Sequence, residues 1–419
     1  MFKKLLCLIG GLIIVAGCDT DVNESGRTLS SDSIKVGMII PTTGSLASLG
    51  LTSRNSAQLA VKEINDAGGI GGQQIELIIR DSRIDGPTGV AAAQELRDLG
   101  VVAIIGAAAS SVTLFTSQNQ TIADGIPLIS PFSTSPLIAE LNDNNTVWRT
   151  IASDAFQGVI LADLLISDNV STVSGFFRDD PYGSGLFAAF KQRFESQGGT
   201  VLAEVSYPGS KEFGFNAEIQ ALLANGTPEA IVAITFFTDG GNFTRDLVAA
   251  GQNNIQLYGV DGNFGVALIN NGAPQVLEGM KGTAPVPPKE TANYQTFFNN
   301  FESTFGFEPD VFGESSYDAV YLIALSMLQG GAATKESIIN NLQSVSRPDG
   351  SSAVIITPNQ FATAISAVSS GSDIDYEGAS GAIGFDNNGD VTSGTYVVWQ
   401  IQSNSGNLEF AELEVISIP

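Results

Sequence analysis

The feature that most constrains the fold of this chain is a regular alternation of short apolar runs with amphipathic stretches. The run Ile34–Ile40 is rich in β-branched residues, and a Gly/Ser/Thr loop follows it. Beyond the loop, apolar residues recur at helical spacing from Ala57 to Ile64, and Gly68 ends the stretch. Strands that alternate with helices form parallel sheets covered by helices on both faces. The sequence therefore predicts an α/β fold.

The alternation occurs in two series, separated near residue 150. The predicted strands span 34–40, 74–80, 101–106 and 126–130 in the first series, and 170–177, 201–206, 230–236 and 255–259 in the second. The predicted helices between them span 87–99, 112–124, 182–197, 215–224 and 242–250. Each series has the pattern of a doubly wound parallel sheet. We therefore expect two lobes of similar architecture.

The last third of the chain is mostly helical, which predicts that it completes lobes begun earlier. Helices are expected at 294–305, 316–329 and 335–342, after a proline-rich crossing at 285–288. The segment DNNGD at 386–390 predicts a hairpin turn, because Val391 stands where a calcium loop needs glycine. A strand at 395–401 follows in an antiparallel tail. The expected boundaries are 34–150 for the first lobe, 151–283 for the second, 284–375 for a return to the first, and 376–419 for a return to the second with the tail.

The N-terminal segment has the features of an export signal. A basic start at Lys3 and Lys4 precedes an apolar run that ends in Val15-Ala16-Gly17-Cys18, which resembles the lipobox of bacterial lipoproteins. The resemblance implies a signal peptide at 1–17, lipid chains on Cys18, and a polar tether over 18–33. By similarity to enteric lipoproteins, Asp19 favours the inner membrane. An ordinary secretory leader with a chance cysteine is the alternative.

The amino-acid composition excludes several kinds of catalytic and metal site. The chain has no histidine, and both of its cysteines, Cys7 and Cys18, lie in the leader region. The folded part therefore has no histidine-dependent triad, no cysteine nucleophile and no common zinc site, so we expect no metal, no cofactor and no enzyme activity. Lys and Arg number 19 against 44 Asp and Glu. This negative charge disfavours nucleic acid and anionic lipid surfaces as partners, and it aids solubility.

Candidate site residues follow from the ends of the predicted strands. Ligands of open α/β sheets bind beyond the carboxyl ends of the strands. Two such ends run into hydroxyl-rich helix starts that contain Ser110 and Thr134. Free N–H groups there favour a carboxylate, although both residues could instead cap their helices. In the second series, a strand ends at Asp261, which is either an opposing acid or a turn residue before Gly262.

Several segments in order resemble one known family. IKVGMIIPTTGSLASLG, AVKEINDAGGIGGQQIELIIRDS, VVAIIGAAASSVT, IPLISPFSTSP and YEGASGAIGFDNNGDV are similar to the branched-chain amino-acid (Leu/Ile/Val) binding proteins of ABC importers. The similarity extends from residue 34 to about residue 400. It implies the type I periplasmic binding protein fold, in which three crossover strands join two lobes. It also implies an extracytoplasmic receptor that captures a small neutral, aliphatic amino acid by hinge closure, and passes it to a permease and its ATPase.

The resemblance also implies roles for individual residues. The Ser110 hydroxyl, together with the hydroxyl and N–H of Thr134, would bind the ligand's α-carboxylate. The main-chain carbonyl of Phe132 would accept from its ammonium group. Asp261 would hold the ammonium group from the second lobe, and Tyr182 would close over the ligand.

Three further positions are less like the family. Phe236 stands where the family has a tyrosine, so a hydroxyl is lost, and Leu49 replaces an aromatic residue of the side-chain pocket. Asp154 is either a second ammonium partner or a hinge residue. These departures leave an amide, urea or aromatic acid open as the ligand, and a membrane-tethered sensor without transport open as the function. We expect the protein to act as a monomer.

Overall fold

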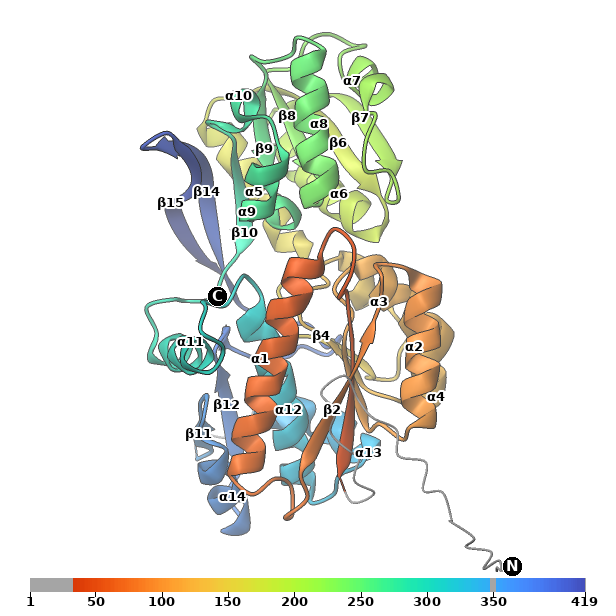
Figure 1. The fold of residues 1–419 in the computed structure, drawn as a ribbon, viewed down its shortest axis with the longest axis vertical. Helices are drawn as coiled ribbons and strands as arrows, with labels where there is room; N and C mark the ends of the chain where they lie inside the picture. Colours follow the sequence, from red (N-terminus) through yellow and green to blue (C-terminus); the bar gives the residue numbers. More distant parts are fainter. Residues whose placement is uncertain (1–32, 347–351, 419) are drawn as a thin grey trace, which may run out of the picture.

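The computed structural model describes residues 33–346 and 352–418, and it contains two α/β lobes stacked along the long axis (Figure 1). The predicted architecture of two sheets covered by helices is confirmed. The expected signal peptide, Cys18 and nearly all of the tether lie outside the described residues. No helix in the described ranges has both the length and the apolar character of a membrane span.

The first lobe is built on a five-stranded parallel sheet of order β2-β1-β3-β4-β5. Its strands are β1 (Ile34–Ile40), β2 (Ile75–Asp81), β3 (Ala103–Gly106), β4 (Leu128–Ser130) and β5 (Val147–Arg149). Its helices are α1 (Ala47–Asp66), α2 (Gly86–Asp98), α3 (Ser110–Thr116), α4 (Ile122–Asp124), the π-helix η1 (Ser117–Thr121) that joins α3 to α4, and the 3-10 helix η2 (Pro136–Glu140). Every residue of β3 and β4 is buried, which matches their continuous apolar sequences. The carboxyl ends of both strands face the second lobe.

The second lobe is built on a seven-stranded sheet of order β15-β14-β10-β9-β8-β6-β7. Its strands are β6 (Thr172–Asp179), β7 (Thr200–Pro208), β8 (Ala230–Ile234), β9 (Gln256–Gly259), β10 (Lys281–Pro285), β14 (Gly394–Asn404) and β15 (Asn407–Ile418). Its helices are α5 (Asp154–Ser167), α6 (Pro181–Ser196), α7 (Asn216–Leu222), α8 (Phe237–Ala249), η3 (Asp261–Asn263), α9 (Val266–Asn271) and α10 (Pro274–Leu277). Strands β6 to β10 are parallel, whereas β14 and β15 run antiparallel.

The chain between the last two crossings packs on the first lobe. It contains α11 (Ala292–Phe305), α12 (Gly313–Gly330), α13 (Lys335–Ser346), β11 (Val354–Ile356), α14 (Phe361–Ser369), β12 (Ile374–Gly378) and β13 (Gly381–Ala382). Helix α12 lies along α1 and is buried over most of its length. Strand β12 pairs with β11 and β13 in a small third sheet. The expected boundary at 376 falls inside β12, and the chain crosses to the second lobe only after β13.

The polypeptide passes between the lobes three times, at 150–153, 286–291 and 383–393, and side chains tie these crossings together. Buried Arg149 forms two hydrogen bonds with Asp390, of 2.5 and 2.6 Å, which join the first crossing to the third. Asp390 belongs to the turn predicted at 386–390, which the structure confirms through the 2.8 Å bond from Asp386 N–H to the Asp390 carbonyl. Gln157 donates to the Thr283 carbonyl at 3.0 Å and so links α5 to β10, which leads into the second crossing.

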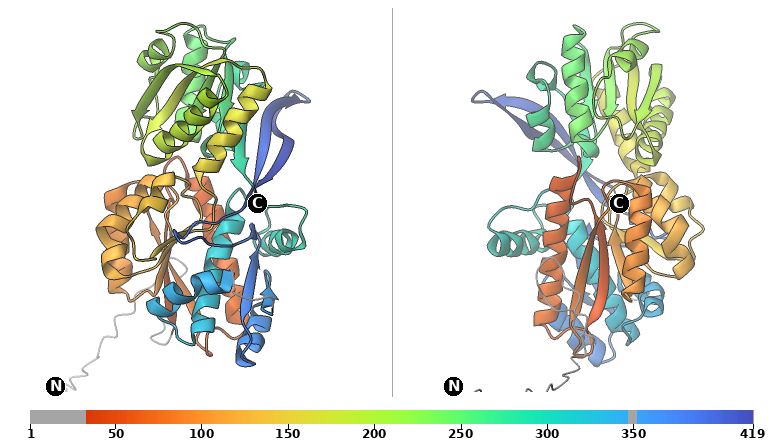
Figure 2. Two further views of the ribbon diagram at one scale, coloured as in Figure 1. Left: turned by 180° about the vertical axis from the view of Figure 1, so that it is seen from behind. Right: turned by 45° about the vertical axis from the view of Figure 1, so that its right-hand side comes forward.

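Some elements differ from the sequence predictions. The antiparallel strand predicted at 395–401 is confirmed as β14, but it forms a hairpin with an additional strand, β15, that projects beside the second lobe (Figure 2). Helix α8 starts at Phe237 instead of residue 242, because the buried Asp239 in its first turn accepts hydrogen bonds from Arg178 (2.7 Å) and Tyr207 (2.6 Å). Tertiary contacts thereby make helix from the polar, glycine-containing segment TDGG. Helix α5 was not predicted at all.

Candidate functional site

Seven of the eight candidate residues line one cavity between the lobes. The first lobe contributes Leu49, Ser110, Phe132 and Thr134, and the second contributes Tyr182, Phe236 and Asp261. The remaining lining residues, which the sequence did not single out, are Leu46, Ala108, Ala109, Gly262 and Phe312. Asp154 lies behind Thr134 and contacts it directly. The chain therefore gathers the ends of β3, β4, β8 and β9 around a single space, as expected for ligands of open sheets.

The first-lobe side of the cavity presents hydrogen-bond donors at the start of α3. Ala109 and not Ser110 occupies the N-cap of this helix. The Ser110 hydroxyl accepts instead from the Ser135 N–H at 3.2 Å, which leaves its own hydrogen available to the cavity. Ser135 in turn caps η2, so neither Ser110 nor Thr134 serves as the side-chain cap that was the alternative for them.

Thr134 and Asp154 bind each other reciprocally. The Thr134 hydroxyl donates to the Asp154 carboxylate at 2.8 Å, and the Asp154 N–H donates to the Thr134 carbonyl at 2.8 Å. The hydroxyl hydrogen predicted for a ligand carboxylate is thus already used. Within the described residues, no acceptor takes the Thr134 N–H, so the main chain is the donor that this residue can offer the cavity.

The second-lobe side presents an acid fixed by a tyrosine. The Tyr182 hydroxyl donates to Asp261 at 2.8 Å and accepts from the Gly262 N–H at 3.0 Å. Tyr182 is held at the start of α6 by Asp180, whose side chain accepts from the N–H groups of Tyr182 and Gly183. Asp261 opens the short helix η3 and lines the cavity from there.

The two acids lie close enough at this end of the cavity to affect each other's ionisation. Burial raises the pKa of Asp261 to about 6, although the hydrogen bond from Tyr182 opposes the shift. Burial and then the charge of Asp261 raise the pKa of Asp154 well above its usual range. One oxygen of Asp154 has no hydrogen-bond partner. No Lys or Arg lines the cavity, and nearby Arg149 is paired with Asp390. A cationic group placed here would relieve the repulsion between the carboxylates.

Aromatic and aliphatic side chains form the other walls. The Phe236 ring lies between the Arg178 guanidinium, 3.9 Å from its centroid, and the Tyr182 ring, 5.7 Å away. Phe312 contacts Phe132 edge-on at 5.2 Å. Its φ of 66° lies in the left-handed region, which is strained for a phenylalanine. Phe312 has no local sequence signal, because it comes from the returning chain just before α12.

The family comparison agrees with this geometry. The model of the family described as periplasmic binding protein matches residues 33–405. The chain belongs to the periplasmic binding protein family. It is thus a solute-binding protein in its fold, and the expected family is confirmed.

Individual relatives of this periplasmic binding protein add detail. It is 26% identical over 385 residues to a leucine-, isoleucine-, valine-, threonine- and alanine-binding protein of Pseudomonas aeruginosa, covering 91% of this chain and 93% of the relative. Its fold is similar to a leucine-binding protein of Thermotoga maritima, with a TM-score of 0.75, 23% identity, and 91% and 98% of the two chains covered. It is also similar to an ABC transporter solute-binding protein of Rhodopseudomonas palustris in complex with 3,4-dihydroxybenzoic acid, with a TM-score of 0.72, 21% identity, and 92% and 98% covered.

Proposed function

We propose that this protein is the extracytoplasmic receptor of an ABC importer and that it captures a neutral, aliphatic amino acid between its lobes. The observation that carries the proposal is the polarity of the cavity between them. Its second-lobe side has the buried acids Asp261 and, behind Thr134, Asp154, without a basic side chain in the lining. Its first-lobe side has the Ser110 hydroxyl and free main-chain donors. A zwitterion satisfies both ends at once.

The proposed pose follows from these two ends. The ligand ammonium group would contact Asp261 and the Phe132 carbonyl, with the unpartnered oxygen of Asp154 nearby. The carboxylate would accept from Ser110, from the Thr134 N–H and from the first amides of α3. The side chain would then lie against the apolar walls. These walls are formed by Leu46, Leu49 and Phe312.

An aromatic acid is the second candidate, because the four rings of the cavity and the Rhodopseudomonas palustris structure favour it. A benzoate, however, brings no positive charge. Its binding would leave Asp154 and Asp261 facing each other with no counterion and would add a third carboxylate. Amides and urea bring only neutral donors. The charge balance therefore favours an amino acid over these ligands.

The remaining parts of the proposal concern location and partners. Lipid chains on Cys18 and the tether at 18–33 would hold the lobes at the outer face of a membrane, beside a permease and ATPase. The edge strand β15 carries Glu409, Glu412 and Glu414, so pairing with a second copy would oppose like charges, which supports a monomer. A tethered sensor would use the same closure without transport. We propose no catalysis and no nucleic-acid partner.

A thermal-shift screen of the purified protein tests the proposal. L-leucine, L-isoleucine and L-valine are compared with D-leucine, acetamide, urea and benzoate. A cognate ligand at 100 times its Kd adds ~2.7 kcal/mol to the free energy of unfolding, because it binds only the folded state. We expect at least one L-amino acid to raise the melting temperature and D-leucine to have a much smaller effect. A shift with benzoate and none with any L-amino acid would replace the amino acid by an aromatic acid.

A further inference from the structure

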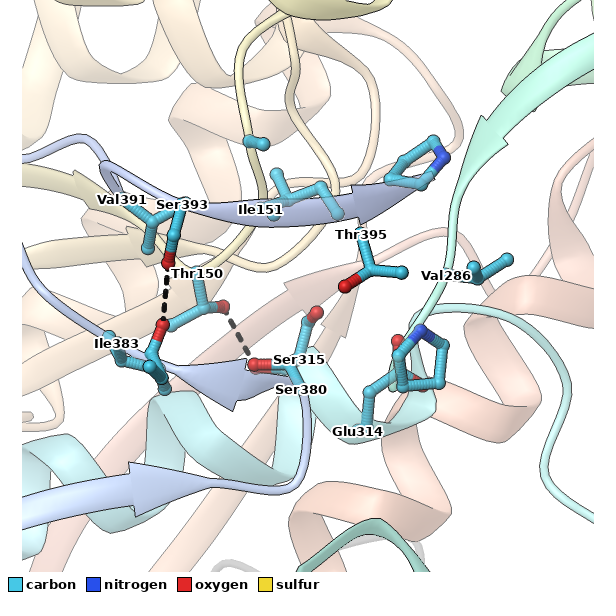
Figure 3. A pocket seen from close by; sticks show the side chains of 15 residues that line it. Thr150, Ile151, Val286, Glu314, Ser315, Ser380, Ile383, Val391, Ser393 and Thr395 are labelled. Atoms are coloured by element: carbon cyan, nitrogen blue, oxygen red, sulfur yellow. Dashed lines mark hydrogen bonds between the residues drawn. The ribbon is translucent and has the colours of Figure 1, made fainter. Parts of the chain in front are cut away.

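A second cavity lies where the three crossings meet, apart from the ligand cavity. Figure 3 shows it between the start of β14, the end of β10 and the start of α12. All three crossings contribute to its wall: Thr150, Ile151 and Ala152 from the first, Val286 and Pro287 from the second, and Ile383, Val391 and Ser393 from the third. The strand ends beside them add Pro285, Ala382, Gly394 and Thr395, and the first lobe adds Glu314, Ser315 and Ser380.

Glu314 is the charged residue of this cavity. It lies in the first turn of α12 and is only 4% exposed. Within the described residues it takes part in no ion pair. The titratable groups that face it are Asp318 one turn along the same helix, Lys289 from the second crossing, and Tyr294 of α11. Lys289 is paired with Glu412, and its charge opposes the raised pKa of Glu314 only in part.

The start of α12 is in contact with both the hinge and the ligand cavity. The Thr150 hydroxyl of the first crossing donates to the Ser315 carbonyl at 2.9 Å. The Ser315 hydroxyl is buried and has no partner. Phe312, two residues before Glu314, lines the ligand cavity. Residues 312–315 therefore connect the wall of the ligand site with the wall of the hinge cavity.

We propose that Glu314 makes the angle between the lobes depend on protonation, with the closed form holding the neutral acid and the open form exposing the carboxylate to water. Opening moves the backbone of all three crossings, and these crossings wall the cavity, so a change of angle changes the hydration of Glu314. A buried, unpaired carboxylate is costly, whereas the protonated acid is not.

The direction of the pH effect follows from burial. In the structure described here, burial raises the pKa of Glu314 to about 8, with Asp318 adding to the shift and main-chain hydrogen bonds opposing it. In an open form, hydration brings the pKa back toward the usual value for glutamate. Closure is therefore favoured at low pH and loses this advantage as the pH rises toward 8. Because one proton is involved, the equilibrium constant for closure, the ratio of closed to open protein, falls by at most tenfold per pH unit.

Small-angle scattering of the ligand-free protein tests the proposal without reference to any ligand. The radius of gyration is measured at pH 6.5 and pH 9.0 for the wild type, Glu314→Gln and Glu63→Gln. Glu63 is a matched control, since burial also raises its pKa but it lies in the first lobe among Tyr317, Tyr321 and Asn300. We expect the wild type and Glu63→Gln to expand clearly more at pH 9.0 than Glu314→Gln does, because ionisation of Asp154 and Asp261 contributes equally to all three proteins.

Titration with L-leucine over pH 7.0 to 9.0 provides the second measurement, and it rests on the proposed function. As the pH rises, the Kd for leucine should increase several-fold in the wild type and less in Glu314→Gln. The difference between the two increases is the contribution of Glu314. Equal pH responses of wild type and Glu314→Gln in both measurements overturn the hinge proposal. A scattering response that depends on Glu314, in a protein that binds no leucine, supports the hinge proposal and counts against the amino-acid ligand instead.

Discussion

Asp261 provides the sharpest test of the ligand site. The change Asp261→Asn keeps the size of the side chain and an oxygen that can accept from Tyr182, so the 2.8 Å bond at this position can persist. It removes the negative charge of a residue that is only 6% exposed to solvent. We expect the variant to fold with near-native stability and to bind L-leucine much more weakly, because the ligand ammonium group loses its main partner from the second lobe.

The expected loss follows from burial. Leaving one partner of a buried ion pair without its counterion costs ~3–5 kcal/mol, which corresponds to a roughly 150- to 5,000-fold rise in Kd. Asp154 remains near the ammonium group in this variant, so we expect the lower end of that range. Isothermal titration calorimetry measures it directly.

Asp168→Asn is the matched control for this experiment. Asp168 is also a second-lobe carboxylate that accepts from a tyrosine, Tyr258, at 2.6 Å, but it pairs with Lys281 away from the cavity. Its replacement should leave the Kd within about twofold, since it touches neither the ligand nor the crossings. If Asp261→Asn bound leucine as tightly as Asp168→Asn does, the assignment of the ammonium group to Asp261 would be wrong.

Two further predictions concern pH and the hinge. In the Glu314→Gln variant, which removes the opposite pH effect expected from that residue, affinity for L-leucine should rise about tenfold from pH 5 to pH 7. A ligand ammonium group favours ionised Asp261, whose pKa of about 6 in the free site makes binding release a proton; a flat titration series in this variant would contradict the assignment. Arg149→Met should lower the free energy of unfolding, measured in urea, by ~3–5 kcal/mol, because it leaves Asp390 and two main-chain carbonyls without their buried donor. Arg193→Met should lower it by less than about 1 kcal/mol, because the pair of Arg193 with Asp163 is exposed. Similar losses in both arginine variants would refute the role given to the crossing.

The lobes could be predicted from sequence because their signals are local. Strands such as β3 and β4 are continuous apolar runs, and the helices between them have one apolar face and end at glycine. The elements that were missed depend on distant partners. Helix α8 begins early because Asp239 meets Arg178 and Tyr207 from other strands. Strand β15 alternates glutamates with apolar residues at a sheet edge, and only its pairing with β14 fixes it as a strand.

The residues of the ligand site also fall into those with a local sequence signal and those placed by distant contacts. Ser110, Thr134 and Asp261 could be found because each follows a predicted strand, and topology brings the carboxyl ends of such strands together. Phe312 could not, because it reaches the cavity from a helix start on the returning chain. The direction of the Thr134 hydroxyl was also beyond the sequence, since it depends on how α5 begins. A helix at 154–167 places Asp154 close enough to take that hydrogen bond.

This last contact changes how recognition and closure are related. Asp154 is the first residue of α5, immediately after the first crossing, and it is bonded in both directions to Thr134 at the end of β4. A ligand that accepts from the Thr134 N–H and donates to Asp261 therefore contacts both lobes and lies one side chain away from the hinge. Both carboxylates belong to the second lobe, and closure buries them against the first. Their desolvation opposes closure of the free protein, whereas a bound ammonium group offsets that cost, so that ligand charge, and not contact area alone, determines which state is stable.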